Sequence, residues 1–358
     1  MKIGLVTIAH GQNYGNRLQN YAIQQIFEDM GHEIETIRHP YFGFSKKVLA
    51  GIVVKKTLNY KYTKEARRIW KFTQFNHKYI KFSKLYIKSG NVDKNLSDSY
   101  DLFLCGSDQV WNPNYFIEKD SYFLSFVEGK KKIALSASFG IEKIESEKEK
   151  NRISKRLKEL TAISVRERSG QDLVKYLSGR SSELIIDPTL YLTPKQWMKI
   201  EKKPKNIKPG EYVLMYLLGR YTKERIEKIK KQFINQGKEV ILLENEYSNL
   251  RMCSKEEFSM NPSEFIWLIR NSHMVITDSF HAIIFSLLFQ KEFTIVKRDT
   301  IEEDISTRIK HLIEMFDIEN PYNEEYKDIK AAIVNNAYIN QILTVERARF
   351  MNFIESSL

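Results

Sequence analysis

The sequence predicts an α/β protein of two domains, each built on a mainly parallel sheet, that face each other across a cleft. Short apolar segments alternate with longer amphipathic segments along the chain, which is the pattern of parallel α/β domains. Four of the eight prolines fall in residues 188–210, a composition that suits a linker. The 358 residues, 42% of them hydrophobic, are sufficient for two separate cores.

The first domain is expected over residues 1–187, where apolar segments predict strands and amphipathic segments predict helices. It contains a basic insertion at 46–90 that we expect to be helical. The strands are expected at 2–8, 32–37, 100–106, 131–138, 161–166 and 182–187, and the helices at 17–30, 146–159 and 168–178.

The second domain is expected over residues 211–330, after the linker at 188–210. A last helix within 331–358 is expected to pack back on the first domain. The strands are expected at 211–219, 238–245, 273–278 and 292–298, and the helices at 222–236, 262–271 and 280–289.

The composition and the missing motifs limit the classes of protein to consider. No stretch approaches the ~20 apolar residues that span a bilayer, and the apolar start is too short for a signal peptide, so we expect a cytoplasmic protein. Cys105 and Cys253 lie far apart, which argues against a disulfide framework or a cysteine metal site. The sequence contains no GxGxxG, no GxxxxGK[ST] and no HExxH. We therefore expect no metal and no cofactor.

The formal net charge of +12 predicts anionic partners. Much of this charge lies in residues 46–84, where Lys and Arg are mixed with Tyr, Phe and Trp at helix-like spacing. Such a segment suits an anionic membrane surface or a nucleic acid, or else it is a solvated basic helix pair that covers the sheet. We expect no nucleic-acid partner and a peripheral position at the inner face of the membrane.

Polar residues follow the predicted strands of the first domain, at the edge of a parallel sheet where ligands bind. Amide side chains after the first strand suit sugar hydroxyls, although Asn16 would equally serve as a helix N-cap. Asp108 is a candidate base, although it or Ser107 would equally cap a turn. Trp111 is either a sugar-stacking platform or a core anchor. The polar or aromatic residues singled out at this edge are Asn13, Asn16, Gln19, Ser107, Gln109 and Trp111.

Basic residues and one histidine follow other predicted strands. His281 lies where a strand ends and an apolar helix begins, so it can carry a proton beside an anion held by the helix N-terminus. A hydrogen-bonded packing histidine is the alternative. Arg166 can clamp a carboxylate or phosphate, or it forms an ion pair with a neighbouring Glu. Lys297, Arg298 and Arg308 are further candidates for binding an anionic donor.

Six segments of the chain resemble the polysaccharide pyruvyl transferase family and stand in that family's order, from about residue 2 to about residue 312. The resemblance implies a GT-B-like fold with two Rossmann-like domains. It also implies transfer of pyruvate from phosphoenolpyruvate to two hydroxyls of a sugar, forming a cyclic ketal, with His281 as the catalytic histidine and Arg166 as a donor ligand. The segments are GNRLQNYA, LCGSDQVWNP, SASFG, ISVRERS, DPTLYL and TDSFHAIIFSLLF.

One position departs from this family. Many members have an arginine two residues before the histidine, where this chain has Ser279. We expect Ser279 to be a neutral donor in the donor site and one of Lys297, Arg298 or Arg308 to replace the missing charge. The resemblance further implies a nucleotide-linked or lipid-linked saccharide acceptor in surface polysaccharide or cell-wall glycan assembly. A carboxylate near that acceptor is expected to assist proton removal, and Asp108 and Asp278 are the two candidates. The residues expected to bind the acceptor are Asn13, Asn16, Gln19, Ser107, Gln109 and Trp111.

Two other functions fit parts of the sequence. A GT-B glycosyltransferase would use a nucleotide sugar, which it should bind and hydrolyse slowly. A non-catalytic protein that binds nucleic acid or a membrane surface would use residues 46–84, and its binding should weaken with salt. A pyruvyl ketal transferase differs from both because it releases phosphate from phosphoenolpyruvate.

Overall fold

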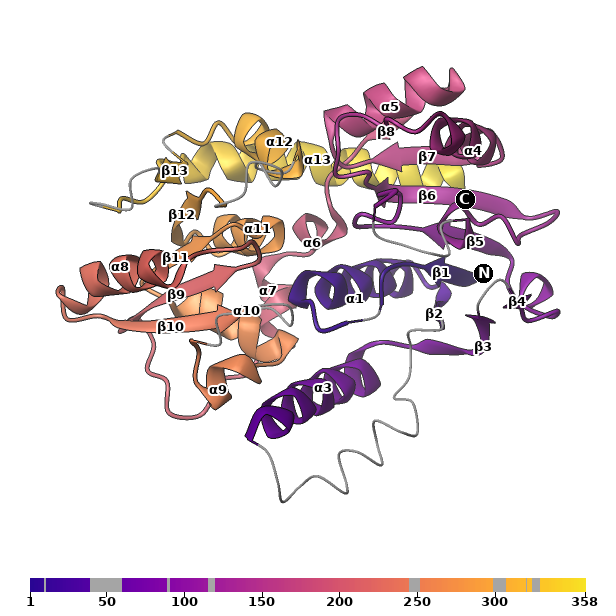
Figure 1. The fold of residues 1–358 in the computed structure, drawn as a ribbon. Helices are drawn as coiled ribbons and strands as arrows, with labels where there is room; N and C mark the ends of the chain where they lie inside the picture. The colour runs from indigo at the N-terminus through magenta and orange to yellow at the C-terminus, as the bar shows by residue number, and fades with distance from the viewer. Residues whose placement is uncertain are drawn as a thin grey trace.

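The computed structural model of the protein contains two parallel sheets with helices packed on their faces (Figure 1). It describes residues 1–9, 11–38, 60–88, 91–114, 120–244, 252–298, 307–319, 321–323 and 329–358. The predicted α/β class, with two Rossmann-like sheets in a GT-B-like arrangement, is confirmed.

The first sheet contains eight strands in the order β4-β3-β2-β1-β5-β6-β7-β8. Every neighbouring pair is parallel except β3 and β4, which are antiparallel. The central strand β5 is buried along its whole length, which explains its continuous apolar sequence. The bounds are β1 Lys2–Val6, β2 Glu33–Arg38, β3 Phe82–Lys88, β4 Asn91–Val92, β5 Leu102–Cys105, β6 Lys131–Ala137, β7 Ala162–Val165 and β8 Glu183–Leu184.

Residues 82–88 form strand β3, so the prediction of a helical insertion up to residue 90 is wrong for this part. Helix α3 (Tyr60–Tyr79) precedes the strand. Buried and more exposed side chains alternate along β3, and this period of two is that of a half-buried strand. Aromatic and basic residues continue from the helix into the strand, so the composition does not mark the boundary. Residues 46–59 of the predicted insertion lie outside the described residues.

The second sheet contains five strands in the order β10-β9-β11-β12-β13, and its neighbouring pairs are all parallel. Strand β9 is buried at each of its positions, as expected for the centre of a sheet covered on both faces. The bounds are β9 Tyr212–Leu217, β10 Glu239–Glu244, β11 Met274–Thr277, β12 Glu292–Val296 and β13 Tyr322–Asn323.

The helices connect the strands, and their starting points position the polar residues at the sheet edges. Helix α1 begins at Tyr14, earlier than expected, because the Asn13 side chain accepts from the backbone N–H of Asn16. Asn13 is therefore the N-cap, and the alternative that Asn16 caps this helix is wrong. The bounds are α1 Tyr14–Asp29, α4 Glu147–Lys158, α5 Arg168–Ser178, α6 Pro188–Tyr191, α7 Pro194–Met198, α8 Lys223–Ile234, α9 Lys255–Phe258, α10 Pro262–Asn271, α11 Phe280–Leu288, α12 Thr307–Met315 and α13 Asn336–Ser357, with 3-10 turns at Ser97–Ser99 and Ser121–Phe123.

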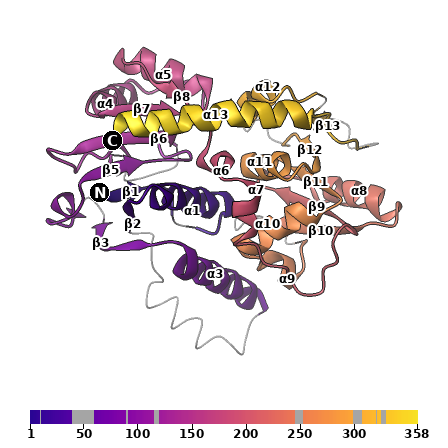
Figure 2. The same cartoon turned by 180° about the vertical axis from the view of Figure 1, so that it is seen from behind.

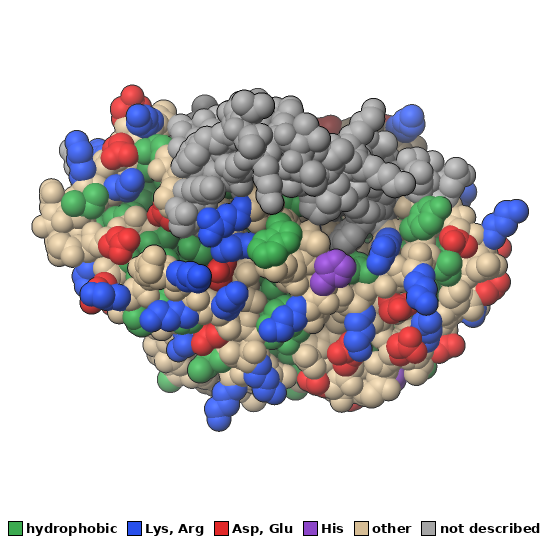
Figure 3. Space-filling model, turned by 90° about the horizontal axis from the view of Figure 1, so that it is seen from below, with side chains coloured by type: hydrophobic (Ala, Val, Ile, Leu, Met, Phe, Trp, Pro, Cys, Tyr) green, Lys and Arg blue, Asp and Glu red, His purple; other side chains and the backbone are tan. Residues whose placement is uncertain are grey.

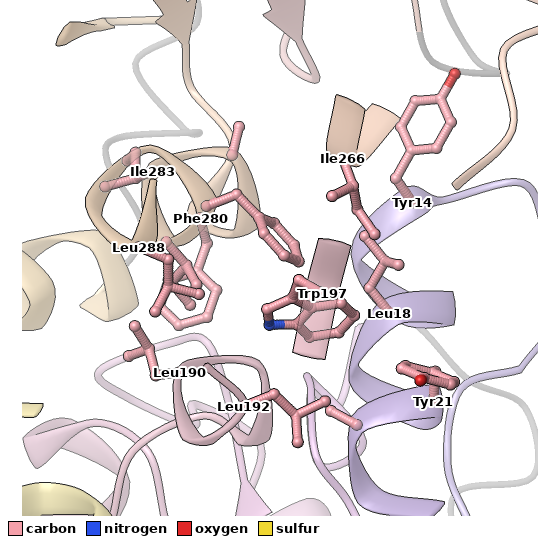
Figure 4. Packing of buried hydrophobic residues seen from close by; sticks show 14 of the residues in the cluster. Tyr14, Leu18, Tyr21, Leu190, Leu192, Trp197, Ile266, Phe280, Ile283 and Leu288 are labelled. Atoms are coloured by element: carbon pink, nitrogen blue, oxygen red, sulfur yellow. The ribbon is translucent and has the colours of Figure 1, made fainter. Parts of the chain in front are cut away.

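The proline-rich segment between the sheets is packed into a shared core. Trp197 of α7 is fully buried, and its ring centroid lies 5.6 Å from that of Tyr21 on α1 and 4.9 Å from that of Phe285 on α11 (Figure 4). One hydrophobic cluster thus runs from α1 through α6 and α7 to α10 and α11. The limits predicted for the two domains stay a prediction, since this core is continuous across them.

The last helix, α13, runs in the foreground of Figure 2 from the side of β13 to the side of β6, and it contacts α6. At its end, Lys131 Nζ from β6 donates to the carbonyl oxygens of Ser357 at 3.2 Å and Leu358 at 2.6 Å. The chain end is thereby held against the first sheet. Within the described part of the chain, no helix combines the length and the apolar character needed to cross a membrane.

Candidate active site

Five charged or titratable side chains from both halves of the molecule meet between the two sheets, and we call them the central cluster. Asp108 follows β5, Arg166 follows β7, and Asp187 begins α6. His281 lies in the first turn of α11, and Arg308 lies in the first turn of α12. All of these positions follow strands or begin helices, which is where ligands bind in parallel α/β folds. The structure therefore brings together three of the predicted strand-end residues and Arg308 with one residue that was not predicted, Asp187.

Arg166 lies at the centre of this cluster, and its side chain is fully buried. Its Nη2 donates to Asp108 Oδ1 at 2.7 Å and its Nη1 donates to Asp187 Oδ2 at 2.5 Å. Its guanidinium also stacks over the ring of Phe280, 4.6 Å from the centroid. The ion-pair alternative therefore describes Arg166 here, although its close partners are two aspartates rather than the adjacent Glu167.

Both aspartates are ionised in this arrangement. Burial alone would raise the pKa of Asp108, but the charges of Arg166 and Arg308 hold it well below its usual range. Burial likewise opposes ionisation of Asp187, and the charge of Arg166 outweighs it, so that this pKa is lowered as well. A carboxylate with a lowered pKa binds protons weakly. Asp108 is thus better suited to hold charge than to remove a proton by itself.

His281 is 6% exposed, and its Nε2 lies 3.9 Å from Asp187 Oδ2. Among the described residues, Nε2 has no hydrogen-bond partner. Burial lowers the pKa of His281 to about 4, because desolvation outweighs the opposite effect of the two aspartates. At neutral pH the ring is therefore uncharged. It is a buried base whose free nitrogen faces the acidic side of the cluster.

Gly15 makes room for the His281 ring. A Cβ atom at this position would lie 2.0 Å from His281 Nδ1, so only glycine fits without a shift of the ring. Gly15 belongs to the first turn of α1, and His281 belongs to the first turn of α11. The N-termini of two helices therefore meet at the histidine, and both direct partial positive charge there.

Arg308 is the cation of the central cluster that reaches solvent, with a side chain 15% exposed. Its Nη1 lies 3.4 Å from Asp108 Oδ1, and its guanidinium lies 5.2 Å from the centroid of Phe280. When the Gln109 amide oxygen faces it, Gln109 accepts from Arg308 Nη2 at 2.6 Å. The two predicted residues Gln109 and Arg308 thus form one polar rim.

A second ionic group lies at the ends of β9 and β11, and we call it the Asp278 cluster. Asp278 accepts from the backbone N–H groups of Leu218 at 2.6 Å and Gly219 at 2.7 Å, and from Arg298 Nε at 2.8 Å. The predicted donor ligand Arg298 is therefore engaged by Asp278. Lys297 lies over the ring of Tyr322, 5.7 Å from its centroid.

Three of the residues predicted to bind the acceptor are buried and bonded within the fold. Trp111 is 1% exposed, stacks on Phe123 at 5.1 Å, and donates its Nε1–H to a backbone carbonyl, so the core-anchor alternative is right. Gln19 is fully buried and donates to Thr7 Oγ1. Ser107 is fully buried, with its hydroxyl 2.9 Å from Asp187 Oδ2.

The remaining predicted residues lie near helix starts. Asn13 and Asn16 are partly exposed on the first turn of α1. Ser279 is the N-cap of α11, and its hydroxyl accepts from the N–H of Ala282. No trio of His, Cys, Asp or Glu among the described residues is arranged to hold a metal ion.

Sequence reasoning missed Asp187 and did not foresee the role of Gly15. Asp187 precedes a proline, a pattern that indicates only a helix N-cap, and it does cap α6 by accepting from the N–H of Thr189. A signal for its place in the central cluster was available, because Asp187 is the last residue of a predicted strand, as Arg166 is.

Comparisons with known proteins give one matching family model and several solved structures of similar fold. A family model described as polysaccharide pyruvyl transferase matches residues 13–300. A putative UDP-N-acetylglucosamine 2-epimerase from Listeria monocytogenes is similar in structure, with a TM-score of 0.53 and 10% identity over 100% of this chain and 90% of that chain. The UDP-N-acetylglucosamine 2-epimerase from Rickettsia bellii gives a TM-score of 0.51 and 10% identity, over 99% and 96% of the two chains. These likenesses show a shared fold. No curated protein matches the sequence.

Proposed function

The chain belongs to the polysaccharide pyruvyl transferase family, and from this premise we propose that it transfers pyruvate from phosphoenolpyruvate to two hydroxyls of a saccharide. The product is a cyclic pyruvate ketal on a surface polysaccharide or cell-wall glycan precursor. The acceptor is a nucleotide-linked or lipid-linked saccharide.

One observation carries this proposal: the buried His281, whose Nε2 has no hydrogen-bond partner among the described residues, lies where two helix N-termini and two arginines converge. Helix N-termini and guanidinium groups bind the phosphate and carboxylate of a small anionic donor. A negative charge brought close to the ring raises the pKa of His281 from about 4. Donor binding therefore produces the imidazolium that the reaction requires.

The reaction balances with these residues alone. The imidazolium gives its proton to C3 of phosphoenolpyruvate, which breaks the C2–C3 double bond and makes C2 electrophilic. One sugar hydroxyl forms a bond to C2 and its proton returns to His281. The C2–O bond to phosphate then breaks, the second hydroxyl bonds to C2, and its proton leaves with the phosphate. Neither oxidant nor reductant is consumed.

We assign the missing family charge to Arg308. Of the three predicted replacements, it is the one that contacts the central cluster, whereas Arg298 binds Asp278 and Lys297 lies over Tyr322. Its partial exposure allows it to exchange Asp108 for an anionic ligand. Ser279, at the N-cap of α11, would donate its hydroxyl to the same ligand.

A phosphate-release assay tests the proposed function directly. The purified protein is incubated with phosphoenolpyruvate and a panel of nucleotide-linked and lipid-linked saccharides. The released phosphate is measured, and the products are identified by mass spectrometry. We expect phosphate release to depend on one acceptor and to match the amount of pyruvylated product. Hydrolysis of a nucleotide sugar without use of phosphoenolpyruvate would instead identify a glycosyltransferase.

We also propose that α3 rests on an anionic membrane that carries the acceptor. Trp70 on this helix is 59% exposed, and it shares one helix face with the exposed Arg67, His77 and Lys78. Many Lys and Arg side chains lie on the side of the molecule that is seen from below (Figure 3). An aromatic side chain among basic ones suits the headgroup region of an anionic bilayer. The opposite face holds the helix to the protein, because Arg68 donates to carbonyl oxygens from both halves of the chain.

Vesicle sedimentation tests this contact. The variant W70A/K78E should bind phosphatidylglycerol-containing vesicles several-fold more weakly than wild type, and added salt should weaken wild-type binding. The matched control is K155E, at an exposed position on α4. Equal binding of wild type to neutral and anionic vesicles would contradict the proposal.

A further inference from the structure

Hydrogen bonds to both carboxylate oxygens hold the Asp187 side chain in place. Its side chain is fully buried, and its Oδ1 accepts from the N–H and the hydroxyl of Thr189 at 3.0 and 2.6 Å. Its Oδ2 accepts from Arg166 Nη1 and from the hydroxyl of Ser107. The same Oδ2 lies 3.9 Å from His281 Nε2, too far for a hydrogen bond and close enough for a strong charge interaction.

The charges that surround His281 come from four different parts of the fold. Asp108 and Asp187 are negative, Arg166 and Arg308 are positive, and these four act on the ring. Their formal charges cancel while the histidine is neutral. An anionic donor adds negative charge to this balanced group, and a proton at His281 Nε2 offsets part of it.

We propose that Asp187 is the positioning residue for His281: it is the fixed counter-ion that keeps the protonated ring turned with Nε2 toward the donor. This inference rests on the proposed function, because binding of the anionic donor is what favours protonation of His281. Asp187 is suited to the role because its contacts with Thr189 and Arg166 hold the carboxylate in place when the ring takes up a proton. Gly15 closes the opposite side of the ring and leaves Nε2 as the atom that exchanges a proton.

A merely structural role makes different predictions. Asp187 also caps α6 and neutralises Arg166, and its loss could simply loosen the fold. Asn caps helices as well as Asp, so Asp187→Asn keeps the cap at Thr189 while it removes the charge. Its amide nitrogen cannot accept from Arg166 as the carboxylate does, so that hydrogen bond is lost together with the charge. Thr189→Ala provides the reverse change, since it removes a support of Asp187 and leaves the charge in place.

The ring protons of His281, followed by NMR in the ligand-free protein from pH 3 to pH 8, give the decisive readout. The chain has seven histidines, and the signal that disappears in His281→Gln identifies the ring. In Asp187→Asn we expect the titration midpoint of His281 to fall by about one pH unit, because a counter-ion within 4 Å is lost. Thr189→Ala should lower the melting temperature without a comparable shift. The control is Asp120→Asn, a carboxylate held by Arg152 and Arg156.

Kinetics supply a second readout. At a fixed pH, a fall of one unit leaves about tenfold less protonated His281, so turnover should fall about tenfold. The KM for phosphoenolpyruvate should not rise, because removal of a negative charge reduces repulsion of the donor. An unchanged His281 midpoint in folded Asp187→Asn overturns the inference.

If that variant does not fold, the wild-type midpoint with and without phosphoenolpyruvate decides: donor binding without a rise in the midpoint overturns it. Failure of the protein to bind phosphoenolpyruvate at all refutes the proposed function instead. The effect of Asp187 on the His281 midpoint is then still measured in the ligand-free protein.

Discussion

The central cluster and the Asp278 cluster contain similar residues, but they differ in whether their polar atoms are hydrogen-bonded. Each combines a buried aspartate with an arginine at the end of a parallel strand. Beside each lies a glycine whose missing Cβ leaves room for a side chain of the cluster. In the Asp278 cluster, both carboxylate oxygens are filled by two backbone N–H groups and Arg298. In the central cluster, as far as the described residues extend, His281 Nε2 remains without a hydrogen bond.

This difference separates a structural ion pair from a reactive site. A buried polar atom without a partner costs roughly 1–3 kcal/mol, and a ligand that bonds to His281 Nε2 would recover that free energy. In the Asp278 cluster, both oxygens of Asp278 are hydrogen-bonded within the protein, and these bonds connect the loop after β9 to the end of β11. The central cluster retains a basic nitrogen that an anionic ligand can use.

The largest expected effect comes from His281→Ala compared with Asp278→Asn. Loss of the proton donor should reduce turnover by about 100-fold or more, the usual scale for a general acid. The apolar positions of α11 hold the helix in place, so the melting temperature should change little. Asp278→Asn should instead lower the stability and leave the turnover of each folded molecule nearly intact. Comparable turnover losses in the two variants would erase the distinction between the clusters.

The two glycines sharpen the comparison at the next level. Gly15→Ala places a Cβ 2.0 Å from the His281 ring, which is buried and cannot withdraw. A displacement of about 1 Å at a reacting group can reduce turnover by about 100-fold, and we expect a loss of tenfold or more. Gly219→Ala places a Cβ 2.5 Å from Arg298 Cγ, and that flexible, partly exposed side chain can shift. Steady-state kinetics on both variants should show a loss for Gly15→Ala alone.

Much of the fold was predictable because it depends on local periodicity. Buried parallel strands such as β9 read as continuous apolar runs, and the helices between them are amphipathic. Strand β3 was missed because it is half-buried and the mixture of aromatic and basic residues in the preceding helix continues into it. The start of α1 was misplaced because Asn13 and Asn16 are both good N-cap residues, and only the backbone decides between them.

The site was predictable only as far as strand ends reveal it. His281, Arg166 and Asp108 follow strands, so the sequence places them at the correct edge. The partners of Arg166 and the fit of Gly15 against His281 depend on contacts between distant segments. Trp111 shows the same limit, because its burial is decided by Phe123 and Phe139, which follow it along the chain. Sequence position indicates the edge of the sheet, and packing decides which side chains face a ligand.

Arg308→Ala and Arg298→Ala test the donor assignment. A hydrogen bond to a charged group contributes roughly 1.5–3 kcal/mol, so loss of Arg308 should raise the KM for phosphoenolpyruvate about tenfold or more. Turnover at saturating donor should change less. Arg298→Ala removes a partner of Asp278 and should chiefly lower the melting temperature. A larger KM increase in Arg298→Ala would move the donor site to the Asp278 cluster.

The smallest expected effect is a pH dependence of stability that belongs to the central cluster. Burial lowers the pKa of His281 from 6.5 to about 4, so between these values the unfolded chain binds a proton that the folded protein does not. Stability from this group is therefore complete above pH 6.5 and is lost as the pH falls toward 4. From pH 7.5 to pH 5.5, the free energy of unfolding should decrease by about 1 kcal/mol on this account.

Urea unfolding at both pH values measures this decrease, and His281→Gln isolates it because glutamine stays neutral. The wild-type decrease should exceed that of the variant by about 1 kcal/mol. The aspartates of the cluster do not contribute in this range, since their lowered pKa values confine their titration to more acidic solution. Equal decreases in wild type and His281→Gln would mean that His281 is not a desolvated neutral base. The unbonded nitrogen that distinguishes the two clusters would then lose its electrostatic basis.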